Sequence, residues 1–378
     1  MTKNIALYIL LIAGLLLVAA CNAREDRPTR KIQPTETTIA LAPTNPPVTN
    51  TRPAPTATQI APTVILPTAP RAAPTATPTP NRLTFKKGRN DYTISVDNAP
   101  RKYIVYVPTK YDPARPTPVV VMYHGSNQSG NLMYENTNWV DKAEKENIIV
   151  IFPTGWEYPL IGEKGLHEKW NAAGLQNETP PGTELKDDVR FSRALLDTIT
   201  ATFNVDSKRI FATGFSNGGS FVRTRLLPNM SDVFAPGFAI CGSGVVGDID
   251  FEKVTQAKGI LNASLFIVLG TNDDKVHENT GHPLPLPHRA DDIYKDSLFN
   301  KMFVTTTTLL ALSVDYKTET RGPVTLLTFN KSSAGANNEF IFAMVNNMGH
   351  VYPSGNNNRY GLEVTDQFWD FFMRHPKP

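Results

Sequence analysis

The 378-residue chain carries a formal net charge of +3, and 40% of its residues are hydrophobic. Of the 38 basic and 35 acidic residues, 7 basic and 3 acidic ones precede Asn81, so 31 and 32 remain after it. This nearly neutral C-terminal part gives no electrostatic reason to expect a nucleic-acid partner. It has about 300 residues, which is enough to enclose one large hydrophobic core.

The chain begins with the pattern of a secretory signal. Lys3 precedes an apolar stretch of 16 residues, Ile5 to Ala20, which is short for a membrane-spanning helix. Residues 18–21 are Val-Ala-Ala-Cys and resemble a bacterial lipobox, which implies cleavage before Cys21 and lipid attachment to its sulfur. We therefore expect residues 1–21 to direct the protein outside the cytoplasm, lipid-anchored to a bacterial membrane or secreted. An ordinary signal peptide or a signal anchor with an incidental cysteine is the alternative.

Residues 22–80 have the composition of a disordered linker. They are rich in Pro, Thr and Ala and contain 13 of the chain's 31 prolines. Proline removes backbone donors and restricts φ, so we expect an extended spacer between the lipid anchor and a folded domain. The linker need not have a role that depends on its reach.

Cysteine is scarce, with Cys241 the only one besides Cys21. A disulfide within the mature chain is therefore not expected. Cys241 follows the apolar stretch PGFAI, and we expect it to be buried as a small hydrophobic side chain.

From residue 81 to residue 378, strand and helix patterns alternate. The segments 91–96 and 101–107 are typical of paired strands near a sheet edge. Apolar runs that are typical of strands buried on both faces occupy residues 117–125, 147–153, 209–214, 264–270 and 340–345. Helical patterns occupy residues 185–203, 218–228 and 362–373. The alternation predicts one α/β domain with a mostly parallel central sheet and helices on both faces.

Residues 214–218, Gly-Phe-Ser-Asn-Gly, match the motif G-x-S-x-G between an expected strand and an expected helix. In this arrangement the serine has a strained backbone, and glycines flank it because the neighbouring chain leaves no room for Cβ atoms. The N-terminal amides of the following helix face the oxyanion that forms during acyl transfer. Ser216 is therefore a candidate nucleophile, although the motif also occurs by chance in glycine-rich loops.

A nucleophilic serine needs a histidine base and an acid that orients it, in the chain order Ser, acid, His for this architecture. His350 follows the expected strand 340–345 and is the candidate base. The candidate acid follows the strand 264–270, with Asp273 preferred and Asp274 as the alternative. Asp187 and Asp188 precede the serine, and we expect them in a solvated first helical turn.

Two other patterns are better explained without a ligand. His277, His282 and His288 lie in a proline-broken loop, and their spacing matches no zinc pattern, so no metal is expected. Residues 242–247 match G-x-G-x-x-G, but no clear helix begins there, which favours a tight loop near the active site over a dinucleotide site. His124, in the segment YHGSNQ, is expected to be a structural residue of the loop that shapes the oxyanion hole.

The chain from about residue 101 to 353 resembles the secreted α/β-hydrolase esterases grouped as relatives of polyhydroxybutyrate depolymerase and feruloyl or acetyl xylan esterase. The matching segments, in the family's order, are RKYIVYVP, HGSNQ, WN, DDV, VDSKRIFATGFSNGG, GTNDD and GHVYP. The resemblance implies the α/β-hydrolase fold, with Ser216, Asp273 and His350 as catalytic triad. It also implies an oxyanion hole formed by the backbone amides of Ser126 and Asn217.

The chain departs from the family at three positions. Ser126 stands where the family often has Cys, and Leu269 stands where it usually has His. Tyr352 replaces a common Trp, and we expect it to line the substrate cleft, so that substrate preference would differ. Trp170 is a second candidate for the cleft, with a packing role as the alternative.

The sequence thus predicts a serine esterase that works through an acyl-enzyme and needs no cofactor. Its expected substrates are feruloyl or acetyl esters of polysaccharide, or short polyhydroxyalkanoate esters. The alternatives are a peptidase of the same fold and a non-catalytic surface lipoprotein that binds a glycan.

Overall fold

The computed structural model describes residues 82–245, 261–334 and 337–378. The expected signal segment with Cys21, the linker at 22–80 and the end of the 242–247 motif therefore lie outside the described residues. All described residues belong to one unit, Thr75–Pro378.

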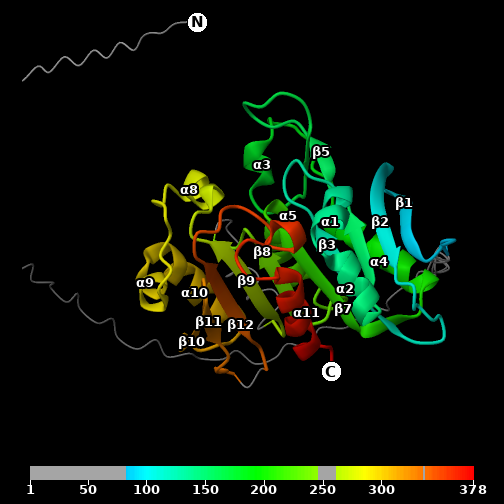
Figure 1. Ribbon diagram of the computed structural model, residues 1–378. Coiled ribbons are helices and arrows are strands. Elements are labelled where there is room, and N and C mark those ends of the chain that lie inside the picture. The colour runs from blue at the N-terminus through cyan, green and yellow to red at the C-terminus, as the bar shows by residue number, and fades with distance from the viewer. Residues whose placement is uncertain (1–81, 246–260, 335–336) are drawn as a thin grey trace, which may run out of the picture. The chain divides into compact units, whose positions relative to one another are not determined.

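A ten-stranded sheet with the order β1-β2-β4-β3-β7-β8-β9-β12-β11-β10 forms the centre of the domain (Figure 1). The strands are β1 (Gly88–Val96), β2 (Ala99–Val107), β3 (Thr117–Tyr123), β4 (Ile149–Pro153), β7 (Val205–Phe215), β8 (Gly237–Cys241), β9 (Ser264–Gly270), β10 (Lys317–Arg321), β11 (Val324–Phe329) and β12 (Phe340–Val345). The strands from β4 to β12 in this order are parallel, whereas β1, β2, β11 and β10 pair antiparallel at the two edges. This mostly parallel sheet confirms the predicted α/β-hydrolase fold.

Helices cover both faces of the sheet. Since side chains alternate along a strand, Val119 and Val121 of β3 join one core cluster and Val120 joins the other. The first cluster contains side chains of α4 (Asp188–Thr202), α5 (Asn217–Phe221), the π-helical turn η1 (Val222–Leu226), α6 (Leu227–Asn229), α9 (Ala290–Lys295) and α10 (Ser297–Leu309). The second contains side chains of α1 (Gly130–Asn136), α2 (Trp139–Glu146) and α11 (Val364–Arg374).

Several elements were not expected from the sequence. They are the hairpin of β5 (Trp156–Tyr158) and β6 (His167–Lys169), the strands β8, β10 and β11, and the helices α1, α2, α3 (Leu175–Glu178), α8 (Asp274–Thr280), α9, α10 and η2 (Gly355–Asn357). The β5–β6 hairpin and α3 lie beyond the end of the sheet where β3 and β7 finish, and they project above α5 (Figure 1). Within the described ranges, the structure contains no helix with the length and apolar character needed to cross a membrane.

Candidate active site

Four loops meet at the carboxyl ends of neighbouring parallel strands. Ser126 follows β3, Ser216 follows β7, Asp273 follows β9 and His350 follows β12. Because parallel strands end at the same edge of a sheet, residues far apart in the sequence are brought together there.

The structure places Ser216, His350 and Asp273 in one hydrogen-bonded row. Ser216 Oγ lies 2.9 Å from His350 Nε2, and His350 Nδ1 lies 2.9 and 3.0 Å from the two carboxylate oxygens of Asp273. The Asp273 side chain is 1% exposed and the His350 side chain is 15% exposed. Asp274, the alternative acid, is exposed at the start of α8. The carboxylate that faces His350 is therefore that of Asp273.

The backbone at Ser216 is strained, as the motif predicted. Its φ is +52° and its ψ is −121°, a conformation that non-glycine residues rarely adopt. A Cβ atom at Gly218 would lie 2.3 Å from the carbonyl oxygen of Tyr123, so only glycine fits there. The turn is held from β8, since the Ser216 amide donates to the carbonyl of Cys241 at 2.9 Å. The hydroxyl consequently points away from the sheet edge, towards His350.

The loops that carry Asp273 and His350 are bonded directly to each other. The amide of Asn272 donates to the carbonyl of Met348 at 2.8 Å, and the amide of Asn347 donates to Thr271 Oγ1 at 2.8 Å. A Cβ atom at Gly270 would lie only 2.0 Å from the Met348 carbonyl oxygen, so this close approach requires glycine. The distance between the acid and the imidazole is therefore fixed by backbone contacts.

Ser216 and His350 open into a cavity of about 610 Å³. Ser126 and Asn217, the two residues whose amides are expected to bind an oxyanion, also line it. Asn217 begins α5, and its side chain pairs with the backbone of Trp170: Oδ1 accepts from the Trp170 amide at 2.7 Å and Nδ2 donates to the Trp170 carbonyl at 3.3 Å. The role of the two amides stays a prediction.

Trp170 does not line this cavity, which corrects one expectation. Its side chain is fully buried and stacks on Phe221, with ring centroids 5.4 Å apart. The indole nitrogen donates to the carbonyl of His124 at 3.0 Å. Burial of the large apolar indole stabilises the core. Trp170 therefore has the packing role that was the alternative to a place in the substrate cleft.

Tyr352 is likewise part of the core and not of the cavity wall. It is 5% exposed, and its hydroxyl accepts from Trp139 Nε1 at 3.0 Å. Its ring packs against Phe215, with centroids 6.2 Å apart, and Phe215 in turn packs against His350 at 5.0 Å. Burial raises the pKa of the phenol above its usual range. Tyr352 thus supports His350 indirectly, through the ring of Phe215. The expectation that Tyr352 contacts substrate is wrong.

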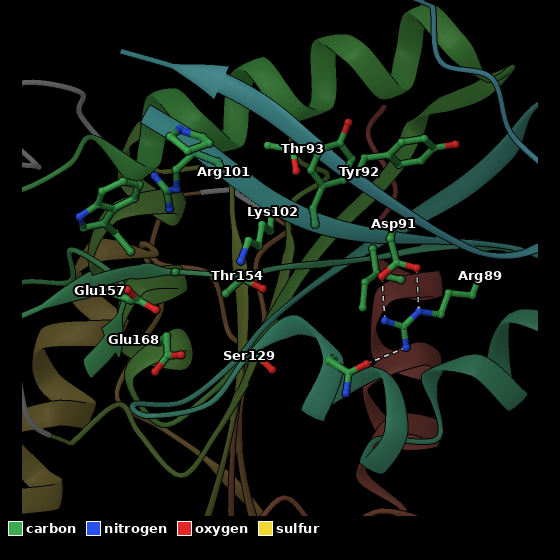
Figure 2. A pocket seen from close by; sticks show the side chains of 16 residues that line it. Arg89, Asp91, Tyr92, Thr93, Arg101, Lys102, Ser129, Thr154, Glu157 and Glu168 are labelled. Carbon is green, nitrogen blue, oxygen red and sulfur yellow. Dashed lines mark hydrogen bonds and ion pairs between the residues drawn. The ribbon is translucent and has the colours of Figure 1, made fainter. Parts of the chain in front are cut away.

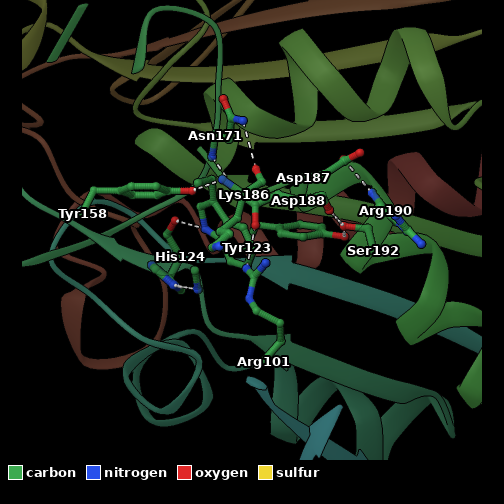
Figure 3. Close-up of polar contacts among 12 residues, drawn as sticks. Arg101, Tyr123, His124, Tyr158, Asn171, Lys186, Asp187, Asp188, Arg190 and Ser192 are labelled. Atoms are coloured by element: carbon green, nitrogen blue, oxygen red, sulfur yellow. Dashed lines mark hydrogen bonds and ion pairs between the residues drawn. The ribbon is translucent and has the colours of Figure 1, made fainter. Parts of the chain in front are cut away.

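The expectation of two solvated acids is wrong for Asp188 (Figure 3). Asp187 caps α4 by accepting from the Arg190 amide at 2.9 Å, but Asp188 points inward and is 1% exposed. Asp188 Oδ1 pairs with Arg101 Nη2 at 2.6 Å, and Oδ2 accepts from the Asn171 amide at 2.7 Å. Burial raises the pKa of Asp188, although Arg101 acts in the opposite direction. The buried pair therefore anchors the segment 170–171 that contacts Asn217.

His124 is buried and neutral, in agreement with the structural role expected for it. Nδ1 lies 2.7 Å from the Gly125 carbonyl, and Nε2 accepts from the Gly155 amide at 2.8 Å. Burial lowers the pKa of His124 to about 4. The imidazole thus connects the β3 loop, which carries Ser126, to the loop after β4.

In the proline-broken loop, His277 and His282 contact other groups of the protein. His282 Nε2 lies 2.7 Å from Asp296 Oδ2, and His277 Nδ1 lies 2.8 Å from the His282 carbonyl. No group of three or more His, Cys, Asp or Glu side chains arranged for a metal occurs in the part of the chain that the structure describes. Gly242 and Gly244 line the active-site cavity, and Cys241 is buried beside them.

Comparisons with known proteins agree with this arrangement. Residues 95–230 match the family model for esterases, described as "Putative esterase". A bifunctional acetylxylan esterase/xylanase of Neocallimastix patriciarum is 28% identical over 187 residues, which cover 49% of this chain and 23% of that protein. Feruloyl esterase B of Piromyces equi is 30% identical over 119 residues, which cover 32% of this chain and 20% of that protein.

The matched region therefore spans about a quarter or less of the length of these two relatives. Among solved structures, an acetyl xylan esterase from Aspergillus awamori is similar, with a TM-score of 0.48 at 15% identity, covering 76% of this chain and 99% of that one. The segment that carries Ser216 is therefore similar to the esterase family, and the matched relatives include an acetylxylan esterase/xylanase and a feruloyl esterase.

Proposed function

We propose that the protein is a serine carboxylic-ester hydrolase whose substrates are acetyl or feruloyl esters of a polysaccharide. The observation that carries the proposal is the row Ser216–His350–Asp273, with Ser216 and His350 open to a cavity. The acetylxylan and feruloyl esterase relatives support the substrate class.

In the proposed reaction, Ser216 Oγ attacks the ester carbonyl while His350 Nε2 accepts the serine proton. The imidazolium that forms is stabilised by Asp273, which lies against Nδ1 and is shielded from water. His350 then donates the proton to the leaving alcohol, and a water molecule hydrolyses the acyl-enzyme by the same steps in reverse.

The amides of Ser126 and Asn217 are the proposed donors to the oxyanion. Each donor in such a site contributes about 3 kcal/mol to stabilisation of the transition state. Asn217 is held in place through its side-chain contacts with Trp170, so its amide direction is set before substrate binds. The Asn217 amide therefore need not move as charge develops on the carbonyl oxygen.

Labelling with a fluorophosphonate probe tests the nucleophile directly. We expect the wild-type protein to be labelled and Ser216→Ala to remain unlabelled, with Ser220→Ala, from the same helix and cavity, as the matched control. Failure of the wild type to react would leave a non-catalytic glycan-binding protein as the better explanation.

A panel of esters tests the substrate class. It consists of feruloyl methyl ester, acetylated xylo-oligosaccharides, hydroxybutyrate oligomers, short p-nitrophenyl esters and a peptide amide. The proposal predicts the highest kcat/KM for the acetylated or feruloylated compounds. Preference for hydroxybutyrate oligomers or for the peptide amide would refute it.

We also propose that the protein is held outside the cytoplasm by a lipid on Cys21, with residues 22–80 as spacer and 81–378 as the catalytic domain. The lipobox-like sequence supports this part of the proposal. Cys21→Ser is expected to release the protein from the membrane fraction, and unchanged retention in that fraction would contradict lipid anchoring.

A further inference from the structure

The domain has a second cavity, of about 570 Å³, whose lining residues are drawn in Figure 2. Residues of β1 and β2, the start of α1 with the loop before it, the loop between β4 and β5, and the β5–β6 hairpin line it. We propose that this cavity binds an uncharged sugar unit of the polysaccharide whose ester is cleaved at Ser216. The inference rests on the proposed function and adds a binding site to it.

One strand separates the two cavities. Glu168 of β6 lines the second cavity, and the next residue, Lys169, lines the active-site cavity. Successive side chains of a strand point to opposite sides, so the two cavities lie on the two sides of β6. A polymer whose ester enters the active-site cavity therefore has to cross only this hairpin to reach the second cavity.

The loop after β3 forms the rest of the shared wall. Residues 125–128 line the active-site cavity, whereas Ser129, the next residue of the loop, and Asn131 of α1 line the second one. The Asn127 amide donates to the Glu168 carbonyl at 2.9 Å, so loop and hairpin are joined between the cavities. Ligand bound in the second cavity would thus contact the loop that carries the proposed oxyanion donor Ser126.

The acceptor groups of this cavity are two carboxylates without partners. Glu157 and Glu168 are directly opposite in the β5–β6 pairing, and both line the cavity. Like charges in this position are unfavourable, and neither carboxylate has a side-chain hydrogen bond or ion pair among the described residues. Hydrogen-bond donors supplied by a ligand, such as the hydroxyl groups of a sugar, would reduce the repulsion between the two carboxylates.

The donor groups lie nearby in Figure 2. Ser129 Oγ already accepts from the Leu132 amide at 3.4 Å and Thr154 Oγ1 from the Gly130 amide at 3.1 Å, so each hydroxyl proton is left to donate. The exposed Lys102 adds an ammonium group. Such a mixture of donors and acceptors suits a polyol, whose hydroxyl groups both donate and accept.

The charge balance disfavours an acidic sugar. Arg101 is engaged by Asp188, and Arg89 pairs with Asp91 through hydrogen bonds of 2.7 and 2.9 Å. Outside these two pairs, one ammonium and two carboxylates line the cavity, so the groups available to a ligand carry one excess negative charge. Trp156 also lines the cavity, and its ring is contacted by the Lys186 ammonium at 5.4 Å from the ring centroid.

Binding to the catalytically inactive Ser216→Ala protein tests the inference without requiring turnover. We expect unesterified xylohexaose to bind in a calorimetric titration, and Glu157→Gln/Glu168→Gln to weaken binding about tenfold, the loss of about one hydrogen bond to a charged group. The substitution preserves shape and removes the like-charge contact, so the fold is retained. Glu319→Gln, from the exposed ion pair on β10, is the control and should bind as the parent does.

Activity provides a second readout that separates this inference from the proposed function. In the active protein, the double substitution should lower the ratio of kcat/KM for acetylated xylohexaose to that for p-nitrophenyl acetate about tenfold. An unchanged ratio, unchanged binding, or binding of Ca²⁺ instead of the oligosaccharide would overturn the inference. Hydrolysis of p-nitrophenyl acetate in the same samples would show that the esterase proposal survives.

Discussion

His124 should make the folded protein less stable in mild acid. Its imidazole is completely buried. Nδ1 lies against the Gly125 carbonyl, and Nε2 accepts a hydrogen bond from the Gly155 N–H group. A proton on Nε2 would face that N–H group and break the hydrogen bond. Burial accordingly lowers the pKa of His124 in the folded protein to about 4, compared with 6.5 in the unfolded chain.

The direction and size of the effect follow from these two values. Between about pH 4 and pH 6.5 the unfolded chain binds a proton that the folded protein does not, so the free energy of unfolding falls as the pH falls. A shift of about 2.5 units, at 1.36 kcal/mol per unit, corresponds to about 3 kcal/mol. This contribution is fully present above about pH 6.5 and is lost at about pH 4.

Urea unfolding of the wild type and His124→Gln, at several pH values from 4 to 7.5, measures this contribution. Glutamine can still accept a hydrogen bond but does not titrate. The difference in free energy of unfolding between His124→Gln and the wild type should therefore change by about 3 kcal/mol across the range, in favour of the variant at low pH. His282→Gln is the control of opposite sign. Burial lowers the pKa of His282, but its hydrogen bond to Asp296 outweighs this effect, so the pKa is raised and that contribution is lost as the pH rises. Parallel stability curves for wild type and His124→Gln would refute the reasoning.

Three further substitutions test the site. Asp188→Asn should destabilise the fold by about 3–5 kcal/mol in chemical denaturation, because it leaves the Arg101 guanidinium buried without a counter-charge; a loss below 1 kcal/mol would contradict this. Asp273→Asn should lower kcat about 10⁴-fold through loss of imidazole orientation, whereas the exposed Asp274→Asn should stay within about twofold of wild type. Gly218→Ala should yield little folded protein in circular dichroism, because of the 2.3 Å contact with the Tyr123 carbonyl.

The parallel core of the fold was predictable because it depends on local hydrophobicity. A strand such as β3, buried on both faces, must be apolar at every position, and this run is visible in the sequence. The strand β10 contains no buried residue, so no apolar pattern marks it, and it is defined only by its pairing with β11. Elements of this second kind depend on partners that a single sequence does not identify.

The proximity of Ser216, His350 and Asp273 could be predicted from the sequence for a related reason. Each residue follows an apolar strand, and parallel strands bring such loops together whatever lies between them in the sequence. The residues alone could not decide between Asp273 and Asp274, because two adjacent aspartates differ only in the direction in which the fold points their side chains. The choice was settled by the capping of α8, where Asp273 accepts from the Lys275 amide and turns its carboxylate inward.

The errors concern large or charged side chains whose depth in the fold depends on distant residues. Asp187 and Asp188 are chemically identical in the sequence, yet the first caps α4 and the second lies one position further into the helix, facing the sheet. Its partner Arg101 is 87 positions away, in the otherwise apolar inner face of β2. A buried acid is tolerated only with a paired base, so an arginine within a buried strand is itself an indication that an acid will be buried opposite. Because Asp188 also binds the Asn171 amide, the position of Trp170 and of Asn217 at the candidate oxyanion site depends on this pair.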